Sequence, residues 1–220
     1  MRLISFITIV GSILLGKPFF QETSIFPFQG KHVHASSIIE TSNGDLIACW
    51  FYGSGERTAN DVLIQGSRLK KGAKTWESVF EMTDTPGLPD CNPVLWIDKE
   101  NKLWLFWIAV RANRWENSML RYRTSINYMN KGAPEWGWQD DIILKPGESF
   151  AEVLQAGFGQ YVDEPMWAEY ALPYTKLIVE AAKDPEKRQK GWMTRIHPIS
   201  LNSGRILLPL YSDGYNVSIV

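Results

Sequence analysis

Short apolar runs recur along the chain, each preceded by a polar turn and each about as long as a β-strand. They are rich in aromatic and β-branched residues, a composition typical of strands. The three clearest runs are NGDLIACWFYG (43–53), ENKLWLFWIAV (100–110) and NSGRILLPLYSDG (202–214). Their likeness predicts an internal repeat.

A second strand and a tryptophan follow each of the first two runs. The strands are predicted at 61–69 and 118–126, and the turns after them end in Trp76 and Trp136, roughly sixty residues apart. A repeat of this length made of strands predicts four-stranded sheets arranged around an axis, because each sheet must bury both faces against its neighbours. The fold class predicted is therefore all-β, a β-propeller.

The repeat also predicts how the chain is divided. Two blades are expected at about 30–85 and 90–145, with the start of a third at about 196–220. Helical spacing at about 146–195 predicts a helical insertion between the second and third units. Two blades and the start of a third do not close a ring, so we expect 17–220 to be the front part of a larger propeller.

Composition and charge limit the classes of partner that this protein is expected to bind. The 220 residues carry a net charge of −1 without a basic stripe, which argues against a nucleic-acid partner. Residues 1–16 hold one positive charge and then an apolar run of signal-peptide length, so we expect export to the periplasm or outside the cell, or else an N-terminal hydrophobic anchor. Oligomeric state is left open.

The chain shows no metal or cofactor motif. Cys49 and Cys91 stand outside any C-x-x-C pattern, and their spacing leaves a disulfide between them open. His32 and His34 alone are a weak metal site. We therefore expect neither a metal nor a cofactor.

The repeat resembles a known family along most of residues 32–220. The matching stretches are HVHASSIIETSNGDLIACWFYGSGERTANDV, DTPGLPDCNPVLWID, LWLFWIAVRANRWENSMLRYRTS and GWMTRIHPISLNSGRILLPLYSDGYNVS. They resemble the sialidase-like (neuraminidase, BNR/Asp-box) glycoside hydrolase superfamily, in its divergent bacterial exo-α-sialidase branch. The resemblance implies a six-bladed propeller, of which this chain is the N-terminal half.

Two departures from the family pattern stand out. The structural Asp-box S-x-D-x-G-x-T-W becomes SRLKKGAKTW (67–76), without its Asp. His34 stands where the family's F-R-I-P arginine would grip the substrate carboxylate. A neutral imidazole cannot form the bidentate pair that a guanidinium forms with a carboxylate.

The resemblance places a proton donor in the loop after the first inner strand, here GSGERTAND (53–61). Glu56 is the favoured acid there, because flanking glycines let the backbone turn and present the side chain. Asp61 is the alternative, and a solvated Glu56–Arg57 turn without catalytic role stays open. His34 is a third candidate catalytic group, because histidine serves as acid or base near neutral pH.

Other polar residues stand near the ends of the inner strands and are expected to meet at one funnel. Arginines recur there in all three units and suit an anionic sugar, although each alone is equally well explained by a surface ion pair. The predicted substrate-binding residues are His32, Arg57, Asp90, Asn92, Arg114, Arg195 and His197.

These features predict a sialidase-like glycoside hydrolase that removes a terminal, acidic sugar from a glycan by general acid catalysis. One alternative is a hydrolase or lyase that acts on uronic-acid or rhamnose polysaccharides through histidine. Another is a propeller that binds carbohydrate without catalysis. In each case the expected partner is a carbohydrate.

Overall fold

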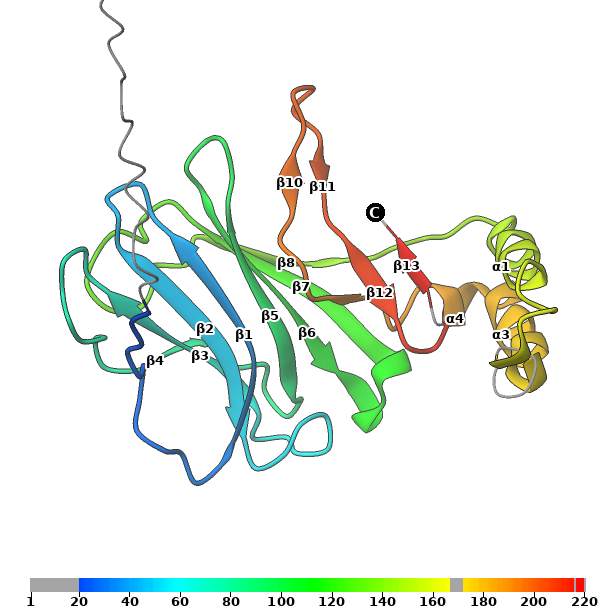
Figure 1. Ribbon diagram of the computed structural model, residues 1–220, viewed down its shortest axis with the longest axis horizontal. Coiled ribbons are helices and arrows are strands. Elements are labelled where there is room, and N and C mark those ends of the chain that lie inside the picture. The colour runs from blue at the N-terminus through cyan, green and yellow to red at the C-terminus, as the bar shows by residue number, and fades with distance from the viewer. Residues whose placement is uncertain (1–19, 167–171, 216, 220) are drawn as a thin grey trace, which may run out of the picture.

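Two four-stranded antiparallel sheets stand side by side in the computed structural model, which describes residues 20–166, 172–215 and 217–219 (Figure 1). Sheet 1 contains β1 (His32–Glu40), β2 (Leu46–Gly53), β3 (Leu63–Leu69) and β4 (Phe80–Thr83). Sheet 2 contains β5 (Asp90–Ile97), β6 (Leu103–Val110), β7 (Ser118–Ser125) and β8 (Trp138–Ile142). In both sheets the strands pair in sequence order, as expected of hairpins that follow one another along the chain.

The third repeat is shorter and interrupted. Sheet 3 has the order β13-β12-β9, and β10 and β11 form a separate hairpin that extends from it. The bounds are β9 (Met193–Thr194), β10 (Ile199–Ser200), β11 (Ile206–Leu207), β12 (Leu210–Ser212) and β13 (Val217–Ile219).

The polar turns from which the repeat was predicted have the same geometry in all three units. A backbone hydrogen bond closes each turn, from Thr41 N to Asp45 O at 2.8 Å in the first unit. The equivalent bonds run from Asp98 N to Lys102 O at 3.1 Å and from Leu201 N to Arg205 O at 2.8 Å. Within the turns Gly44, Asn101 and Gly204 have φ of 84°, 60° and 83°. Glycine and asparagine tolerate this left-handed backbone, which is why they occupy these positions.

The first strands of sheets 1 and 2 also share an irregularity. Pairing shifts between His34 and Ser37 in β1 and between Cys91 and Val94 in β5. Within these β-bulges Ala35 has a φ of 51° and Asn92 a φ of 52°. A bulge bends its strand and redirects side chains, and bulges are frequent beside active sites.

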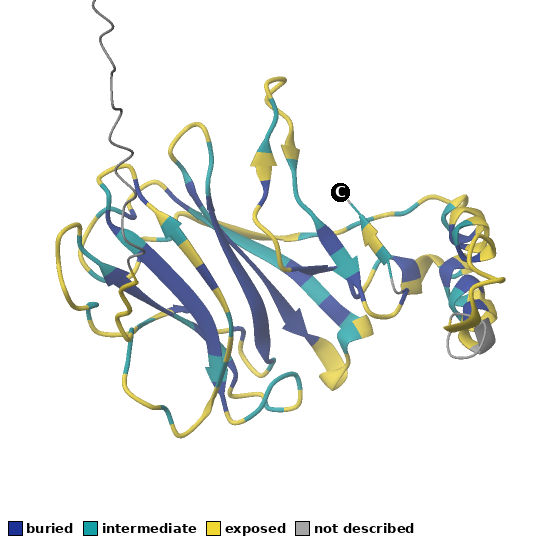
Figure 2. Cartoon of the chain, viewed as in Figure 1, coloured by how far each residue is buried: buried dark blue, intermediate teal, exposed yellow. Residues whose placement is uncertain are grey.

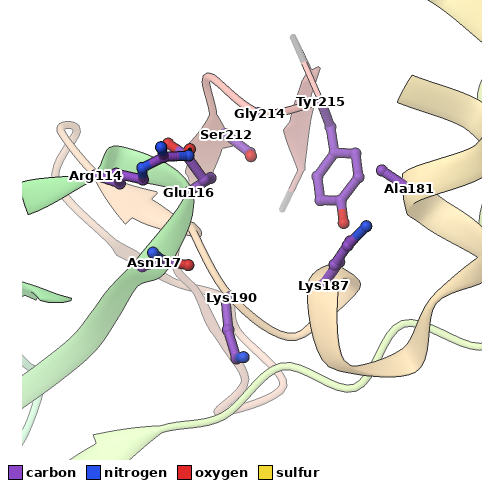
Figure 3. A pocket seen from close by; sticks show the side chains of 9 residues that line it. All are labelled: Arg114, Glu116, Asn117, Ala181, Lys187, Lys190, Ser212, Gly214 and Tyr215. Carbon is purple, nitrogen blue, oxygen red and sulfur yellow. The ribbon is translucent and has the colours of Figure 1, made fainter. Parts of the chain in front are cut away.

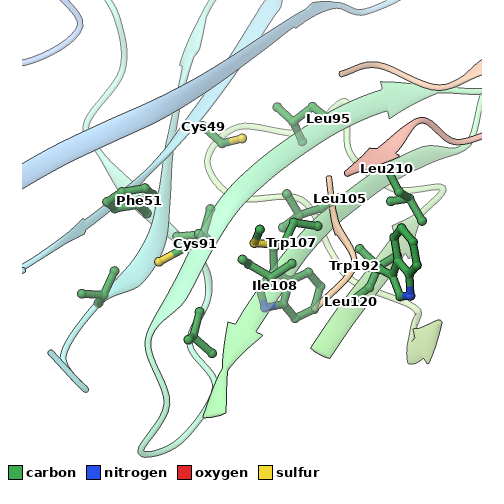
Figure 4. Packing of buried hydrophobic residues seen from close by; sticks show 14 of the residues in the cluster. Cys49, Phe51, Cys91, Leu95, Leu105, Trp107, Ile108, Leu120, Trp192 and Leu210 are labelled. Carbon is green, nitrogen blue, oxygen red and sulfur yellow. The ribbon is translucent and has the colours of Figure 1, made fainter. Parts of the chain in front are cut away.

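One continuous core joins the sheets, and Figure 2 shows the buried centres of β2, β5 and β6 in dark blue. Figure 4 shows the packing of Phe51 from sheet 1, Trp107 and Leu105 from sheet 2, and Trp192 and Leu210 from the region of sheet 3. All five are buried. Sheet 2 therefore buries both of its faces, which explains why its strand β6 is apolar at nearly every position.

Both cysteines belong to this core. Cys49 and Cys91 are free thiols that are completely buried, so the disulfide that the sequence left open is absent between them. Burial raises the pKa of each thiol well above its usual range. These cysteines are therefore unreactive core residues.

Helices lie between sheets 2 and 3 in the chain, within the segment for which the sequence predicted helix. They are α1 (Phe150–Gly159), α3 (Leu172–Lys183) and α4 (Pro185–Arg188). Asp184 caps α4, accepting hydrogen bonds from the backbone N–H groups of Glu186 and Lys187, and Pro185 occupies the first turn. Leu154 and Phe158 of α1 and Val179 and Ala182 of α3 are buried in the core.

The predicted all-β class is confirmed at the level of antiparallel sheets with little helix. The predicted leader, residues 1–16, lies outside the described residues. In the part of the chain that the structure describes, no helix is both long and apolar enough to cross a membrane.

Candidate functional site

Loops from all three repeats meet at one edge of the sheets. Strands β2, β6 and β12 end at this edge, and β5 and β9 begin there (Figure 1). Contacts tie the loops together: the Asp90 N–H donates to the Val62 carbonyl at 2.9 Å, and the Arg57 guanidinium lies 5.5 Å from the centre of the Trp115 ring. The expected convergence of strand-end loops is thus present for sheets 1 and 2.

Tyr211 links sheet 2 to sheet 3 at the same edge. Its hydroxyl accepts hydrogen bonds from Asn92 Nδ2 at 3.0 Å and from the Arg195 guanidinium at 3.1 Å. The Arg195 guanidinium also lies 5.4 Å from the centre of the Tyr211 ring. Asn92 and Arg195, predicted to bind substrate, are therefore brought together through a tyrosine that the sequence analysis did not select.

Asn92 owes its position to the bulge in β5. Its left-handed backbone turns the side chain out of the regular strand, and the amide is 3% exposed. Arg195 is exposed. The pair thus combines a fixed, buried donor with a solvent-accessible cation.

Glu56 lies in the loop after β2 and is partly buried. Within the described part of the chain its carboxyl makes no ion pair. Burial is the main cause of the raised pKa of the Cys91 thiol, and the negative charge of Glu56 is the second cause. Glu56 therefore lies close to β5, the first strand of sheet 2. Glu56 is therefore an uncommitted carboxyl at the edge where the loops meet.

The glycines beside Glu56 act differently from the expectation. Gly53 and Gly55 are absent from the positions with positive φ. A Cβ on Gly53 would lie 2.6 Å from the Val62 Cα, so glycine is needed there for close packing of the loop on its own base. The backbone does bend after Gly53, but without positive φ at either glycine, and close packing of Gly53 on Val62 holds the loop.

Asp61 is committed to its neighbours. Its carboxylate pairs with Lys31 Nζ at 2.7 Å and accepts hydrogen bonds from the backbone N–H and the hydroxyl of Ser54. The hydrogen bonds from Lys31 and Ser54 hold the pKa of Asp61 well below its usual range. A carboxyl that stays ionised is a poor proton donor, so the geometry favours Glu56 over Asp61 for that role.

His32 and His34 lie at the start of β1, beside the end of β2 at this edge, and His197 lies between β9 and β10. His32 and His34 are exposed on β1, and both rings lie against Phe51, at centroid distances of 5.5 and 5.6 Å. His197, also exposed, lies with Nε2 3.4 Å from the Ser37 hydroxyl. Among the described residues, no group of three or more histidine, cysteine or acidic side chains could hold a metal ion.

Asp90 supports the fold beneath this edge. It is fully buried and accepts hydrogen bonds from the Thr85 N–H at 2.6 Å and from Trp107 Nε1 at 2.9 Å. Burial raises its pKa to about 6. Because protein atoms enclose the carboxyl, this placement argues against the predicted substrate contact and gives Asp90 a positioning role.

The three predicted arginines have different surroundings. Arg57 lies on Trp115 and Arg195 on Tyr211, whereas Arg114 is 70% exposed and pairs loosely with Glu116 at 3.4 Å. Among the described residues, no contact joins the three guanidinium groups. The three arginines are therefore not arranged to bind one anion together in this structure.

Strand pairing puts Tyr211 at the functional edge. It pairs with Met193 as Tyr52 pairs with Val33 and as Ala109 pairs with Asp90, each at the end of a second strand. Aligning the polar turns of the sequence puts Ser212 at the position of Tyr52 and Ala109, so the repeat alone does not select Tyr211. Its bond to Asn92 spans 119 residues and depends on how the sheets pack, which the sequence pattern does not reveal.

Comparison with known proteins agrees with the repeat. A family model described as a BNR repeat-like domain matches residues 44–156, just over half of the chain. A search of curated proteins found no match.

Two solved structures are similar to the chain. A crystal structure of a protein of unknown function from Dyadobacter fermentans DSM 18053 is 13% identical with a TM-score of 0.52, covering 86% of this chain and 49% of that one. The structure of the Hadza microbial sialidase Hz136 is 14% identical with a TM-score of 0.48, covering 82% of this chain and 32% of that one. The chain thus spans about half the length of the first of these proteins.

The antiparallel sheets, their repeated turns and the loops gathered at one edge define a β-sheet repeat protein. The chain belongs to the BNR repeat-like domain family, and the predicted sialidase-like BNR assignment is confirmed.

Proposed function

We propose that this chain forms the first part of a six-bladed propeller that hydrolyses a glycan and releases a terminal acidic sugar. Sheets 1, 2 and 3 would be the first three blades. The repeated turns support this arrangement, as does burial of both faces of sheet 2. The rest of the ring would come from the remainder of a longer protein, in keeping with the length of the Dyadobacter structure.

The observation that carries the proposal is the contrast between two carboxyls of one loop. Asp61 forms an ion pair with Lys31 and accepts hydrogen bonds from Ser54, whereas Glu56 is partly buried and makes no ion pair in the described residues. Glycoside hydrolysis needs an acid that can protonate the departing oxygen. Glu56 fits that task, and Asp61 serves to hold the loop.

The neighbouring groups suit an acidic sugar. Arg57 and Arg195 supply positive charge at the edge where Glu56 lies, and Arg guanidinium groups bind carboxylates through paired hydrogen bonds. Trp115 and Tyr211 provide ring faces beside them, and aromatic rings suit the apolar faces of sugars. Asn92 orients the Tyr211 hydroxyl from below.

The test is turnover of the full-length protein on a panel of glycosides that carry sialic or uronic acid. Glu56→Gln should lower kcat roughly 100-fold or more, as expected from the loss of a general acid. Asp61→Asn is the matched control in the same loop and should lower kcat far less. Equal losses in the two variants, or turnover unchanged in Glu56→Gln, would remove Glu56 from the mechanism.

A second candidate function rests on His34. The imidazole is exposed, lies on Phe51, and occupies the position where the family pattern has arginine. A histidine there could act as the acid or base in cleavage of a uronic-acid or rhamnose polysaccharide. Loss of turnover in His34→Ala with Glu56→Gln tolerated would favour this chemistry over the first.

The proposed partner in either case is a carbohydrate. Export of the protein, which we propose from residues 1–16, would bring it to glycans outside the cytoplasm. Fractionation of cells that produce the full-length protein tests this, with recovery in the cytoplasm as the contrary result.

A further inference from the structure

A cavity of about 430 Å³ lies between the helical segment and sheets 2 and 3. Its walls come from the short turn η2 (Trp115–Asn117) after β6, from the turn after β12, and from α3 and the α4 region (Figure 3). Lining residues from these elements are Arg114, Glu116, Lys187, Lys190, Ser212 and Tyr215. The cavity is therefore built from segments that are far apart in the sequence.

Three cations and one carboxylate line the cavity, and two further carboxylates, Asp184 and Glu186, lie beside the lysines. The cations are Arg114, Lys187 and Lys190, and the lining carboxylate is Glu116. Glu116 is 3.4 Å from Arg114, while the two lysines have acidic neighbours on their own helical turn at 3.9 Å. Exposed pairs of this length hold their partners weakly, so the cations are free to bind an anion.

A buried serine hydroxyl at the cavity has no hydrogen-bond partner among the described residues. It belongs to Ser212, which is 2% exposed and lines the cavity. A buried polar group without a partner costs free energy and calls for an explanation such as a missing ligand. A ligand oxygen in the cavity would supply the bond.

Gly214 and Tyr215 form the wall beside the hydroxyl. The centre of the Tyr215 ring lies 5.9 Å from that of the Trp192 ring and 5.2 Å from that of Phe150. The cavity thus has one rigid aromatic wall and one cationic rim.

We propose that this cavity, which adjoins the Glu56 and Tyr211 edge on the side of the helices, binds a carboxylate-bearing sugar unit. Successive residues of a strand point to opposite faces, so the Tyr211 and Ser212 side chains leave β12 in opposite directions. Lys187, Lys190 and Arg114 bind the carboxylate, Ser212 donates to a sugar oxygen, and Tyr215 lies beside the ring. That the anion is carried by a sugar rests on the proposed function, whereas the preference for an anion rests on the lining alone.

Calorimetric titration with the trisaccharide of galacturonic acid tests the proposal, with its methyl ester as the uncharged probe. The double variant Lys187→Gln, Lys190→Gln should bind the acid at least tenfold more weakly than the wild type. The control double variant Lys74→Gln, Lys131→Gln removes the same charge from exposed positions outside the cavity lining and should bind within twofold of the wild type. The ester should bind at least tenfold more weakly than the acid.

Ser212→Ala adds a second, uncharged test, with an expected loss of about threefold to tenfold in affinity. The proposal is overturned if the wild type does not bind the acid, if the ester binds equally well, or if the two double variants bind alike. Binding in a Glu56→Gln background separates this outcome from that of the proposed function. Unchanged turnover in Glu56→Gln would count against the catalytic proposal while leaving the affinities of the lysine variants as an independent result.

Discussion

Sheets 1 and 2 and the interrupted sheet 3 arise from the same repeat but are held together in different ways. Between sheets 1 and 2, Arg123 donates to the Met82 carbonyl at 2.9 Å and Arg121 to the Thr85 hydroxyl at 3.0 Å. The guanidinium of the fully buried Arg68 donates a hydrogen bond to the Tyr128 carbonyl, in the loop between β7 and β8 of sheet 2. Hydrogen bonds from arginine side chains to carbonyl and hydroxyl groups of the neighbouring sheet thus hold this junction together.

Within the described ranges, the junction of sheets 2 and 3 has fewer such bonds. Asn92 reaches Tyr211, and the Gly191 N–H donates to the Ser118 carbonyl at 3.1 Å. In the same region the hydroxyls of Ser118, Thr194 and Ser212 have no hydrogen-bond partner among the described residues. In the part of the chain that the structure describes, the buried polar atoms without a partner at the first junction are instead nitrogens, of Arg68 and Trp136. The difference teaches that more hydrogen bonds hold the first junction, whereas the second carries hydroxyls that can donate or accept a bond.

A matched pair of core substitutions tests this contrast most strongly. Leu105 in sheet 2 is completely buried and Leu210 in sheet 3 is 6% exposed. Leu105→Ala should lower the free energy of unfolding by an amount in the upper part of the range of about 2–5 kcal/mol for such changes, and Leu210→Ala in the lower part. Urea denaturation of the two variants measures both. A larger loss for Leu210→Ala would show that sheet 3 is the more tightly packed region.

The buried Asp90 predicts a pH dependence of stability. Its pKa is raised from 3.8 to about 6 in the folded protein, so the folded state binds the proton more tightly than the unfolded state. The stabilisation is full below the unfolded pKa near 4 and is lost as the pH rises through about 6. Across that window the wild type should lose about 3 kcal/mol relative to Asp90→Asn. Urea denaturation of both proteins at pH 4, 5, 6 and 7 measures the difference, and a constant difference would contradict it.

The smallest expected effect concerns the single link from Asn92 to sheet 3. Tyr211→Phe removes the acceptor for the buried Asn92 amide and should cost about 1–2 kcal/mol in the free energy of unfolding. Tyr122→Phe is the control, because its hydroxyl accepts from Trp138, which is 59% exposed and can bond to water instead. Thermal unfolding compares the two variants. Equal costs would mean that the Tyr211 hydroxyl contributes nothing beyond an exposed hydrogen bond.

Much of the scaffold was predictable from local patterns. The three polar turns with their following strands, the two tryptophan turns and the helical segment are features of neighbouring residues. Glu56 and Asp61 were also placed in the correct loop, because a loop after an apolar strand lies at a sheet edge. Which carboxyl is free could not be predicted, since Asp61 is occupied by Lys31, thirty residues away in the sequence.

The sequence by itself determined the sheets, because alternation, β-branched residues and turn glycines act over a few residues. Only the tertiary structure decided which side chains come together: Tyr211 bonds to Asn92, and Ser212 lines one cavity with Arg114, Lys187 and Lys190. These contacts depend on bulges, on the packing of one sheet against the next and on where the helices lie. Such contacts join residues that are 22 to 119 positions apart in the sequence, and no local pattern encodes them.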